Sequence, residues 1–134
     1  MHLARKTGEM VGLDVPVIPV EHQFLVTEQH PEIMERKKQG LPEMAVLRES
    51  DSAYYLREEA GGMILGIYEK GAPACYVDGP SKDCQYELFN GELDRIMPHI
   101  DRCISRVPAF GEVGIKDIYN GAVSYTHLTL PTKA

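Results

Sequence analysis

Hydrophobic and polar residues alternate between residues 20 and 27, which predicts a β-strand there. In this stretch, VEHQFLVT, every second residue from Val20 is apolar except His22. A period of two is typical of a strand and gives alternate residues the same side of it. His22 is therefore expected to point the same way as Phe24 and Val26. This histidine needs an explanation, because no second histidine, cysteine or acidic pair stands beside it at metal-ligand spacing.

Three more segments predict strands. One is MAVLRE at 44–49, and the others are the two halves of AYYLREEAGGMILGIYE at 53–69. The glycine pair in the middle of the longer segment is typical of a tight turn, so these strands are expected to form a meander. The charged residues 28–43, broken by prolines, predict an excursion with one helical turn. Residues 71–89 are too interrupted for a regular element.

Two segments predict helices. LARKTGEMVG at 3–12 predicts a short helix that ends at Gly12. Between residues 93 and 107, apolar residues recur at steps of three and four, which predicts a long amphipathic helix laid on a core. Pro98 lacks a backbone donor, so a kink or a restart of the helix is expected there. The residues expected to face the core are Ile96, Met97, Ile100, Cys103 and Ile104.

The order of these elements predicts the fold class. After the long helix, GEVGIKDIYNGAV at 111–123 predicts a last strand. Strands, then one helix, then another strand predict an α+β fold. Its sheet should be mostly antiparallel, with one long amphipathic helix packed on it.

Composition and charge exclude several classes of protein. Of the 134 residues, 14 are Lys or Arg and 20 are Asp or Glu, so the formal net charge is −6, which argues against a nucleic-acid-binding surface. Cys75, Cys84 and Cys103 have no C-x-x-C spacing and predict neither a disulfide framework nor a metal site. No apolar run approaches the roughly 20 residues that cross a bilayer, and the first residues lack a signal-peptide core. We therefore expect no membrane partner and a reducing compartment.

Four long runs of sequence resemble one enzyme family. They are LDVPVIPVEHQFLVTE, LPEMAVLRESDSAYYLREEAGGMILGIYE, PSKDCQYELFNGELDRIMPHIDRCISRVPAF and VGIKDIYNGA. Together they cover nearly all of residues 3–122, in order. They resemble the dimethylglycine and sarcosine dehydrogenases, flavoproteins of the D-amino-acid-oxidase-like superfamily.

The resemblance implies a two-domain flavoprotein of which this chain is a part. Family members combine a Rossmann-type FAD domain with a substrate domain built on an antiparallel sheet. Residues 1–122 resemble a central piece of the substrate domain, and they contain no G-x-G-x-x-G after a strand. FAD is therefore expected to bind mainly to an N-terminal part outside this chain, through residues that are unknown. Tetrahydrofolate is a possible ligand of a further C-terminal domain.

The resemblance also implies an activity and its partners. The parent protein is expected to demethylate N-methyl amino acids such as dimethylglycine or sarcosine by hydride transfer from the N-methyl carbon to flavin. It would pass electrons to an acceptor protein or to oxygen. The expected location is the bacterial cytoplasm, or the mitochondrial matrix in a eukaryote. The chain alone is expected to be inactive.

Two residues are implied as catalytic and substrate-binding by the same resemblance. In similar enzymes a histidine in a motif like EHQF lies at the substrate amine, and a tyrosine in a motif like YYLR lines the same pocket. These correspond to His22 and Tyr54. An imidazole can accept or relay the amine proton, and a phenol can orient the amine or carboxylate. Arg48 is a weaker candidate for the carboxylate, and alternation along the strand puts Tyr55 and Arg57 on the side opposite Tyr54.

Other interpretations stay open. From the residues alone, a single strand histidine is more often a hydrogen-bonded structural residue, and Tyr54 would count as sheet packing. Another amine or imino acid oxidase of the same superfamily is an alternative function. A non-enzymatic accessory domain without flavin is a further alternative.

The last residues, 123–134, have no usable periodicity. Back-translation of VSYTHLTLPTK gives DNA that resembles a transposase mosaic end followed by a sequencing adapter. We interpret this stretch as adapter read-through rather than native protein, and exclude it from the fold prediction.

Overall fold

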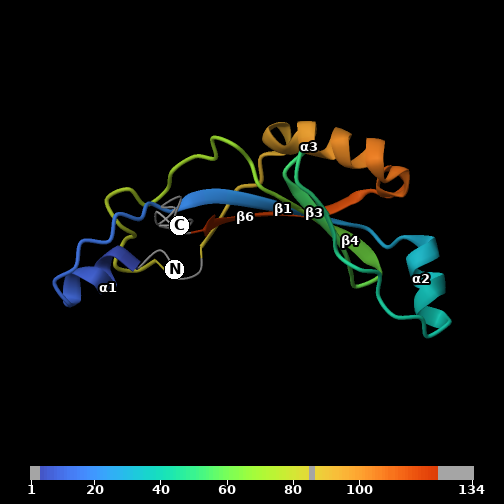
Figure 1. The fold of residues 1–134 in the computed structure, drawn as a ribbon, viewed down its shortest axis with the longest axis horizontal. Coiled ribbons are helices and arrows are strands. Elements are labelled where there is room, and N and C mark those ends of the chain that lie inside the picture. Colours follow the sequence, from blue (N-terminus) through green and yellow to red (C-terminus); the bar gives the residue numbers. More distant parts are fainter. Residues whose placement is uncertain (1–3, 85–86, 124–134) are drawn as a thin grey trace, which may run out of the picture. The chain divides into compact units, whose positions relative to one another are not determined.

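The computed structural model describes residues 4–84 and 87–123 and has an α+β fold (Figure 1). Six strands form one sheet in the order β2-β3-β4-β1-β6-β5. The strands are β1 (Val20–Thr27), β2 (Leu47–Glu49), β3 (Tyr54–Glu59), β4 (Gly62–Ile67), β5 (Leu88–Phe89) and β6 (Ile115–Val123). The helices are α1 (Ala4–Met10), α2 (Pro31–Lys38) and α3 (Leu93–Arg106), with a short 3₁₀ helix, η1 (Pro108–Glu112). The predicted α+β class, antiparallel sheet and long helix are confirmed.

The chain divides into two compact units. The described residues of Met1–His22, Gly71–Phe89 and Gly121–Ala134 make up unit 1, and Gln23–Lys70 with Asn90–Asn120 make up unit 2. In the described part of the chain, every helix is too short or too polar to cross a bilayer. Residues 124–134, nearly all of the stretch interpreted as adapter read-through, lie outside the described residues.

The predicted meander is confirmed in unit 2. Strand β3 pairs antiparallel with β2 and with β4, and β4 pairs antiparallel with β1. The turn between β3 and β4 places Ala60 at φ 49° and Gly61 at φ 88°. Two successive positive φ angles match the right-handed twist of the flanking strands, which explains the short turn.

Helix α2 is longer than the single turn predicted for residues 28–43. It begins at Pro31, whose fixed φ suits the first helical position. The side chain of His30 caps it, because its Nδ1 accepts a hydrogen bond from the backbone N–H of Glu32 at 3.2 Å. Basic residues fill the last turn and favour the negative end of the helix dipole. Histidine is not one of the usual N-capping residues, so this helix start has only a weak signal in the sequence.

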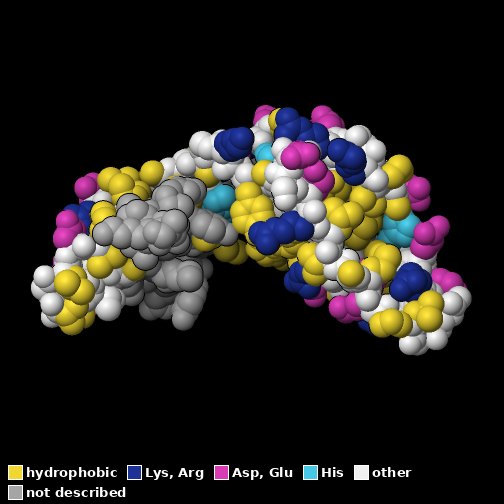
Figure 2. Space-filling model, viewed as in Figure 1, with side chains coloured by type: hydrophobic (Ala, Val, Ile, Leu, Met, Phe, Trp, Pro, Cys, Tyr) yellow, Lys and Arg dark blue, Asp and Glu magenta, His cyan; other side chains and the backbone are white. Residues whose placement is uncertain are grey.

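The core of unit 2 lies between α3 and one face of the sheet. Ile96, Ile100 and Cys103 of α3 are buried in the same hydrophobic cluster as Leu25 and Leu65. The opposite side of α3 is polar, and Figure 2 shows charged side chains over the position of this helix. Two residues expected in the core, Met97 and Ile104, are instead 38% and 36% exposed. Helix α3 has no restart at Pro98.

Strand β1 has the predicted period of two, but its buried side is the one opposite His22. Gln23, Leu25 and Thr27 are buried, whereas Phe24 is 36% exposed. The amide of Gln23 is satisfied by the backbone of Glu92, which allows a polar residue in this position.

Backbone contacts join the start of β1 to the segment around residue 74 in unit 1. Val20 forms an antiparallel bridge with Ala74. The N–H of Glu21 donates to the carbonyl of Pro73 at 2.9 Å, and the N–H of Cys75 donates to the carbonyl of Pro19 at 2.9 Å. Residues 71–89 were predicted to hold no regular element, but the two-residue strand β5 lies at the end of this range. The described residues before β5 contain no helix or strand of more than one residue.

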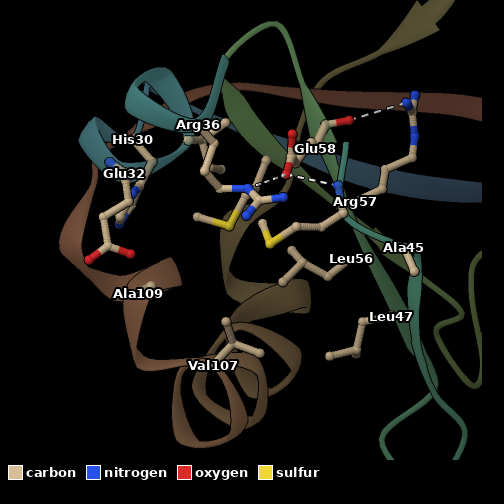
Figure 3. A pocket seen from close by; sticks show the side chains of 13 residues that line it. His30, Glu32, Arg36, Ala45, Leu47, Leu56, Arg57, Glu58, Val107 and Ala109 are labelled. Atoms are coloured by element: carbon tan, nitrogen blue, oxygen red, sulfur yellow. Dashed lines mark hydrogen bonds and ion pairs between the residues drawn. The ribbon is translucent and has the colours of Figure 1, made fainter. Parts of the chain in front are cut away.

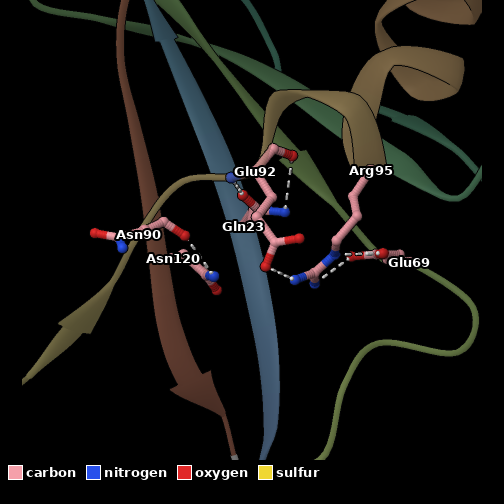
Figure 4. Close-up of polar contacts among 6 residues, drawn as sticks. All are labelled: Gln23, Glu69, Asn90, Glu92, Arg95 and Asn120. Atoms are coloured by element: carbon pink, nitrogen blue, oxygen red, sulfur yellow. Dashed lines mark hydrogen bonds and ion pairs between the residues drawn. The ribbon is translucent and has the colours of Figure 1, made fainter.

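A polar network fixes the beginning of α3 in unit 2 (Figure 4). The side chain of Gln23 accepts from the N–H of Glu92 at 2.7 Å and donates to its carbonyl at 3.4 Å. Arg95 makes a bidentate pair with Glu69, at 2.9 and 2.8 Å, and a third bond to the Glu92 carboxylate at 3.0 Å. The Arg95 and Glu69 side chains are only 17% and 13% exposed.

We expect Arg95→Met to lower the free energy of unfolding by about 2 kcal/mol, because it leaves the partly buried carboxylate of Glu69 unpaired. Urea denaturation followed by circular dichroism measures the change. Lys38→Met is the control: Lys38 pairs with Glu35 at 3.7 Å on the surface, and exposed pairs contribute less than about 1 kcal/mol. Equal effects of the two substitutions would contradict a stabilising role for the Arg95 network.

Candidate functional site

The register of the strands in unit 2 assigns each side chain to one of two faces. Leu25 is opposite Leu65, and Leu65 is opposite Leu56, so these residues share the face covered by α3. Opposed pairs that lie one residue before or after these along the strands have their side chains on the other face of the sheet. There, Phe24 is opposite Gly66.

The other face carries a row of residues that crosses four strands. Gly66 is opposite both Phe24 of β1 and Tyr55 of β3, and Tyr55 is opposite Arg48 of β2. Directly opposed residues lie about 5 Å apart, so their side chains interact. The row therefore brings aromatic and cationic groups together from segments that are distant in the sequence.

Four aromatic residues, Phe24, Tyr55, Tyr68 and Tyr119, form what we call the aromatic face. Phe24 and Tyr119 are stacked, with ring centroids 5.0 Å apart and an interplanar angle of 18°. Tyr55 and Tyr68 lie 6.0 Å apart at 53°. The three tyrosines are partly exposed and Phe24 is exposed. Partly exposed rings with polar ends are suited to binding a small ligand that has both apolar and polar groups.

Gly66 gives the aromatic face its shape. It is buried near the end of β4, and a Cβ atom at this position would overlap the ring of Tyr55. The ring therefore packs directly against the backbone of the strand. Glycine is required here by close approach of a side chain rather than by an unusual φ angle.

Tyr54 lies on the face covered by α3, opposite Ile67, and is fully buried. Burial raises the pKa of Tyr54, and the neighbouring Cys103 adds to this rise. Burial also raises the pKa of the Cys103 thiol, to about 11. Tyr54 is thus surrounded by the core of unit 2, and Tyr55 belongs to the aromatic face.

His22 lies in β1, in the segment that belongs to unit 1, and is half-buried. The period of two along β1 gives it the same side of the strand as Phe24. The neighbouring backbone is fixed by the bond from Glu21 to Pro73. The sequence predicted that His22 points to the same side of β1 as Phe24. The opposite side of β1 is the more buried one.

Arg48 and Arg57 both project from the side of the aromatic face, by their pairing with Tyr55 and Ile64. Arg57 is neutralised by Glu59, whose carboxylate lies 2.7 Å from Nη1. Arg48 instead contacts Tyr68 through its guanidinium group, which lies 5.4 Å from the ring centroid. The predicted alternation of Tyr54 and Leu56 with Tyr55 and Arg57 is confirmed.

A cavity of about 270 Å³ lies elsewhere in unit 2 (Figure 3). Its walls are mostly apolar and include Leu56 and Val107. At its rim, Arg36 Nε lies 4.0 Å from the carboxylate of Glu58, which also accepts a hydrogen bond from the N–H of Met44 at 3.0 Å. These charged groups are matched to each other, so the cavity offers apolar volume rather than a catalytic cluster. Among residues 4–84 and 87–123, no three His, Cys, Asp or Glu side chains cluster to hold a metal ion.

Comparison with known proteins relates the chain to oxidoreductases that act on N-methylated amino acids. It is 38% identical over 133 residues to rat mitochondrial dimethylglycine dehydrogenase, covering 96% of this chain. It is 31% identical over 123 residues to mouse mitochondrial sarcosine dehydrogenase, covering 92% of the chain. It is 28% identical over 123 residues to 4-methylaminobutanoate oxidase (formaldehyde-forming) of Paenarthrobacter nicotinovorans, covering 91%. No family model matches.

The chain is thus homologous to part of the dimethylglycine and sarcosine dehydrogenases, and the predicted resemblance is confirmed. It spans 15%, 12% and 14% of the three relatives' own lengths, respectively. The aromatic face was missed from the sequence. Its signal was the pair Tyr54-Tyr55, which places one tyrosine on each side of a strand, but the sequence did not show which side α3 covers.

Proposed function

We propose that residues 1–122 form part of the substrate domain of an FAD-dependent dehydrogenase that demethylates N-methyl amino acids. Dimethylglycine and sarcosine are the proposed substrates. The homology to dimethylglycine dehydrogenase over 96% of the chain carries this proposal. The aromatic face supports it, because such a surface can form one wall of a pocket for a small zwitterion.

The described residues lack the glycine-rich turn that binds the pyrophosphate in dinucleotide-binding folds. Gly61, Gly62 and Gly66 lie in or beside strands β3 and β4, and β4 is followed by a loop. A pyrophosphate site of the dinucleotide-binding type needs a glycine-rich turn that opens a helix. This chain therefore supplies no such cradle in its described part, and its contribution would be a wall over the ring system and the substrate.

FAD, when bound, supplies the acceptor for a hydride. The substrate amine must first lose its proton, because a protonated nitrogen has no lone pair to assist departure of the hydride. In our proposal the imidazole of His22 accepts that proton, and the C–H bond of the N-methyl group then breaks with its electron pair. The substrate is left as an iminium ion, which water converts to the demethylated amine, formaldehyde and a proton.

Two tyrosines remain candidates for orienting the substrate. The resemblance assigned this role to Tyr54, and that assignment stays a prediction. The aromatic face makes Tyr55 a second candidate, since its ring is partly exposed whereas Tyr54 is fully buried. A hydroxyl must reach the pocket to orient an amine or a carboxylate.

Partners and location follow from the proposed reaction. Electrons pass to an acceptor protein or to oxygen, and a tetrahydrofolate domain elsewhere in the parent protein could take up the one-carbon unit. The name of the bacterial relative states that its reaction forms formaldehyde. The mammalian relatives are named as mitochondrial, which supports a matrix location if the source is a eukaryote.

Activity of the full-length gene product tests the proposal. We expect it to oxidise dimethylglycine or sarcosine in the presence of an artificial electron acceptor and to release one formaldehyde for each two electrons transferred. The panel should include 4-methylaminobutanoate, because the relationship to 4-methylaminobutanoate oxidase favours it as the alternative substrate. Absence of oxidation of all three compounds by FAD-loaded protein would overturn the proposal.

We expect His22→Gln to lower kcat for the preferred substrate by about 100-fold, the usual contribution of a positioned general base. Glutamine keeps a polar side chain of similar size, so the flavin absorption spectrum should be unchanged. His99→Gln is the control, because His99 is held by a contact between its Nδ1 and the carbonyl of Ser52 at 2.9 Å. A His22→Gln enzyme with wild-type kcat would exclude His22 as the base.

A further inference from the structure

Arg48 is an arginine whose guanidinium group is held by a tyrosine. Its Nη2 donates a hydrogen bond to the hydroxyl of Tyr68 at 3.0 Å, and its central carbon lies 5.4 Å from the centroid of the same ring. Two contacts to one side chain restrict the rotation of a group that would otherwise move freely. The ring of Tyr68 is in turn 6.0 Å from that of Tyr55.

The charge of Arg48 is not neutralised within the described residues. No carboxylate of residues 4–84 or 87–123 lies within ion-pair distance of it. Arg57, on the same side of the sheet, differs because Glu59 lies 2.7 Å from it. The two arginines therefore share a face, and only Arg57 already has a carboxylate partner.

The geometry of Arg48 suits a carboxylate ligand. A guanidinium group has five N–H donors in a plane, and the bond to Tyr68 uses one of them. The remaining donors can make two parallel bonds to a carboxylate. Arg48 is exposed, so a ligand can approach these donors.

We propose that Arg48, positioned by Tyr68, binds the carboxylate of the N-methyl amino acid substrate and so selects amino acids over simple amines. This inference rests on the proposed function. It accounts for one property shared by dimethylglycine, sarcosine and 4-methylaminobutanoate, which differ around the nitrogen and in chain length but all carry a carboxylate.

The first test uses the full-length gene product and two substrates, dimethylglycine and its neutral amide, N,N-dimethylglycinamide. We expect the wild-type enzyme to prefer the acid in kcat/KM. Arg48→Met should reduce the ratio of acid to amide about 50-fold, mainly by raising KM for the acid, because hydrogen bonds to charged groups are worth one to two orders of magnitude in affinity. Arg48→Lys should fall between wild type and Arg48→Met, because lysine keeps the charge without the planar fork.

Arg57→Met is the matched control, since it removes the same group from the same face while Arg48 is intact. We expect its acid-to-amide ratio to stay within about twofold of wild type. Equal ratios in the Arg48→Met, Arg57→Met and wild-type enzymes would overturn the assignment of Arg48 and leave the proposed function standing.

A second test does not need turnover. Methoxyacetate is a carboxylate that cannot undergo amine oxidation, and calorimetric titration of the full-length protein measures its Kd. Arg48→Met should weaken binding about 50-fold, and Arg57→Met should not. If the wild-type protein oxidises no N-methyl amino acid and yet binds methoxyacetate through Arg48, the proposed function fails and the carboxylate site stands. Unchanged binding in Arg48→Met overturns the site.

Discussion

Gly66→Ala is expected to displace the ring of Tyr55 and to destabilise the pairing of β3 with β4 by about 2 kcal/mol. The added Cβ would overlap that ring, so the ring or the strand must move. Hydrogen exchange measured by mass spectrometry on peptides from β3 and β4 of the full-length gene product reports the change. A loss of 2 kcal/mol corresponds to roughly 30-fold faster exchange of amides that open with these strands.

Gly114→Ala is the control for this substitution. A Cβ at Gly114 would meet only the side chain of Glu28, at 3.7 Å, which is an ordinary contact. A second check is the pair Tyr55→Ala with Gly66→Ala: once the ring is absent, the added methyl group should cost less than in the wild-type background. If Gly66→Ala exchanges like wild type, the ring of Tyr55 does not pack on Gly66 in solution.

The sequence predicted which residues share a side of each strand, but not which side is buried. The alternation of Tyr54 and Leu56 with Tyr55 and Arg57 follows from local geometry alone. In β1, by contrast, the side with Phe24 and Val26 is the more apolar one in the sequence, and the opposite side is the one that is buried. The choice depends on where α3 packs and on Glu92, which satisfies the amide of the strand's buried glutamine. Both lie about 70 residues further along the chain.

The row formed by Arg48, Tyr55, Gly66 and Phe24 shows the same limit for the candidate site. The β3–β4 register follows from the short turn at residues 60 and 61, and it could be predicted. The alignment of β1 with β4 joins residues about 40 positions apart and is set by packing. The motifs around His22 and Tyr54 therefore indicated which strands form the candidate site. The aromatic face could be recognised only from the three-dimensional structure.

Helix α2 was only partly predicted from the sequence, for a different reason. Its eight residues are mostly charged or polar, so hydrophobic periodicity is weak over 31–38. The helix is instead fixed at its N-terminus by the His30 cap and by burial of Ile33. A buried cap of this kind is a tertiary feature, since His30 is only 2% exposed.

Substitution of the adjacent tyrosines separates the two assignments for the substrate pocket. We expect Tyr55→Phe to lower kcat/KM for the preferred N-methyl amino acid about tenfold in the full-length gene product, because loss of one hydrogen bond to a charged group costs about 1.5 kcal/mol. Tyr54→Phe should leave kcat/KM within about twofold of wild type. Its hydroxyl lies in the core beside Cys103, and the thiol is a weak hydrogen-bond partner.

Both variants are expected to keep the stability of the fold. Tyr54→Phe removes a buried hydroxyl that has no strong partner, so stability should be equal to or slightly above that of wild type. Tyr55→Phe keeps the ring that packs on Gly66 and should also be stable, so reduced activity cannot be ascribed to unfolding. If Tyr54→Phe lowers kcat/KM and Tyr55→Phe does not, the role implied for Tyr54 by the family resemblance is right. The substrate would then be expected on the side of the sheet covered by α3, because Tyr54 and Tyr55 project from opposite faces of one strand.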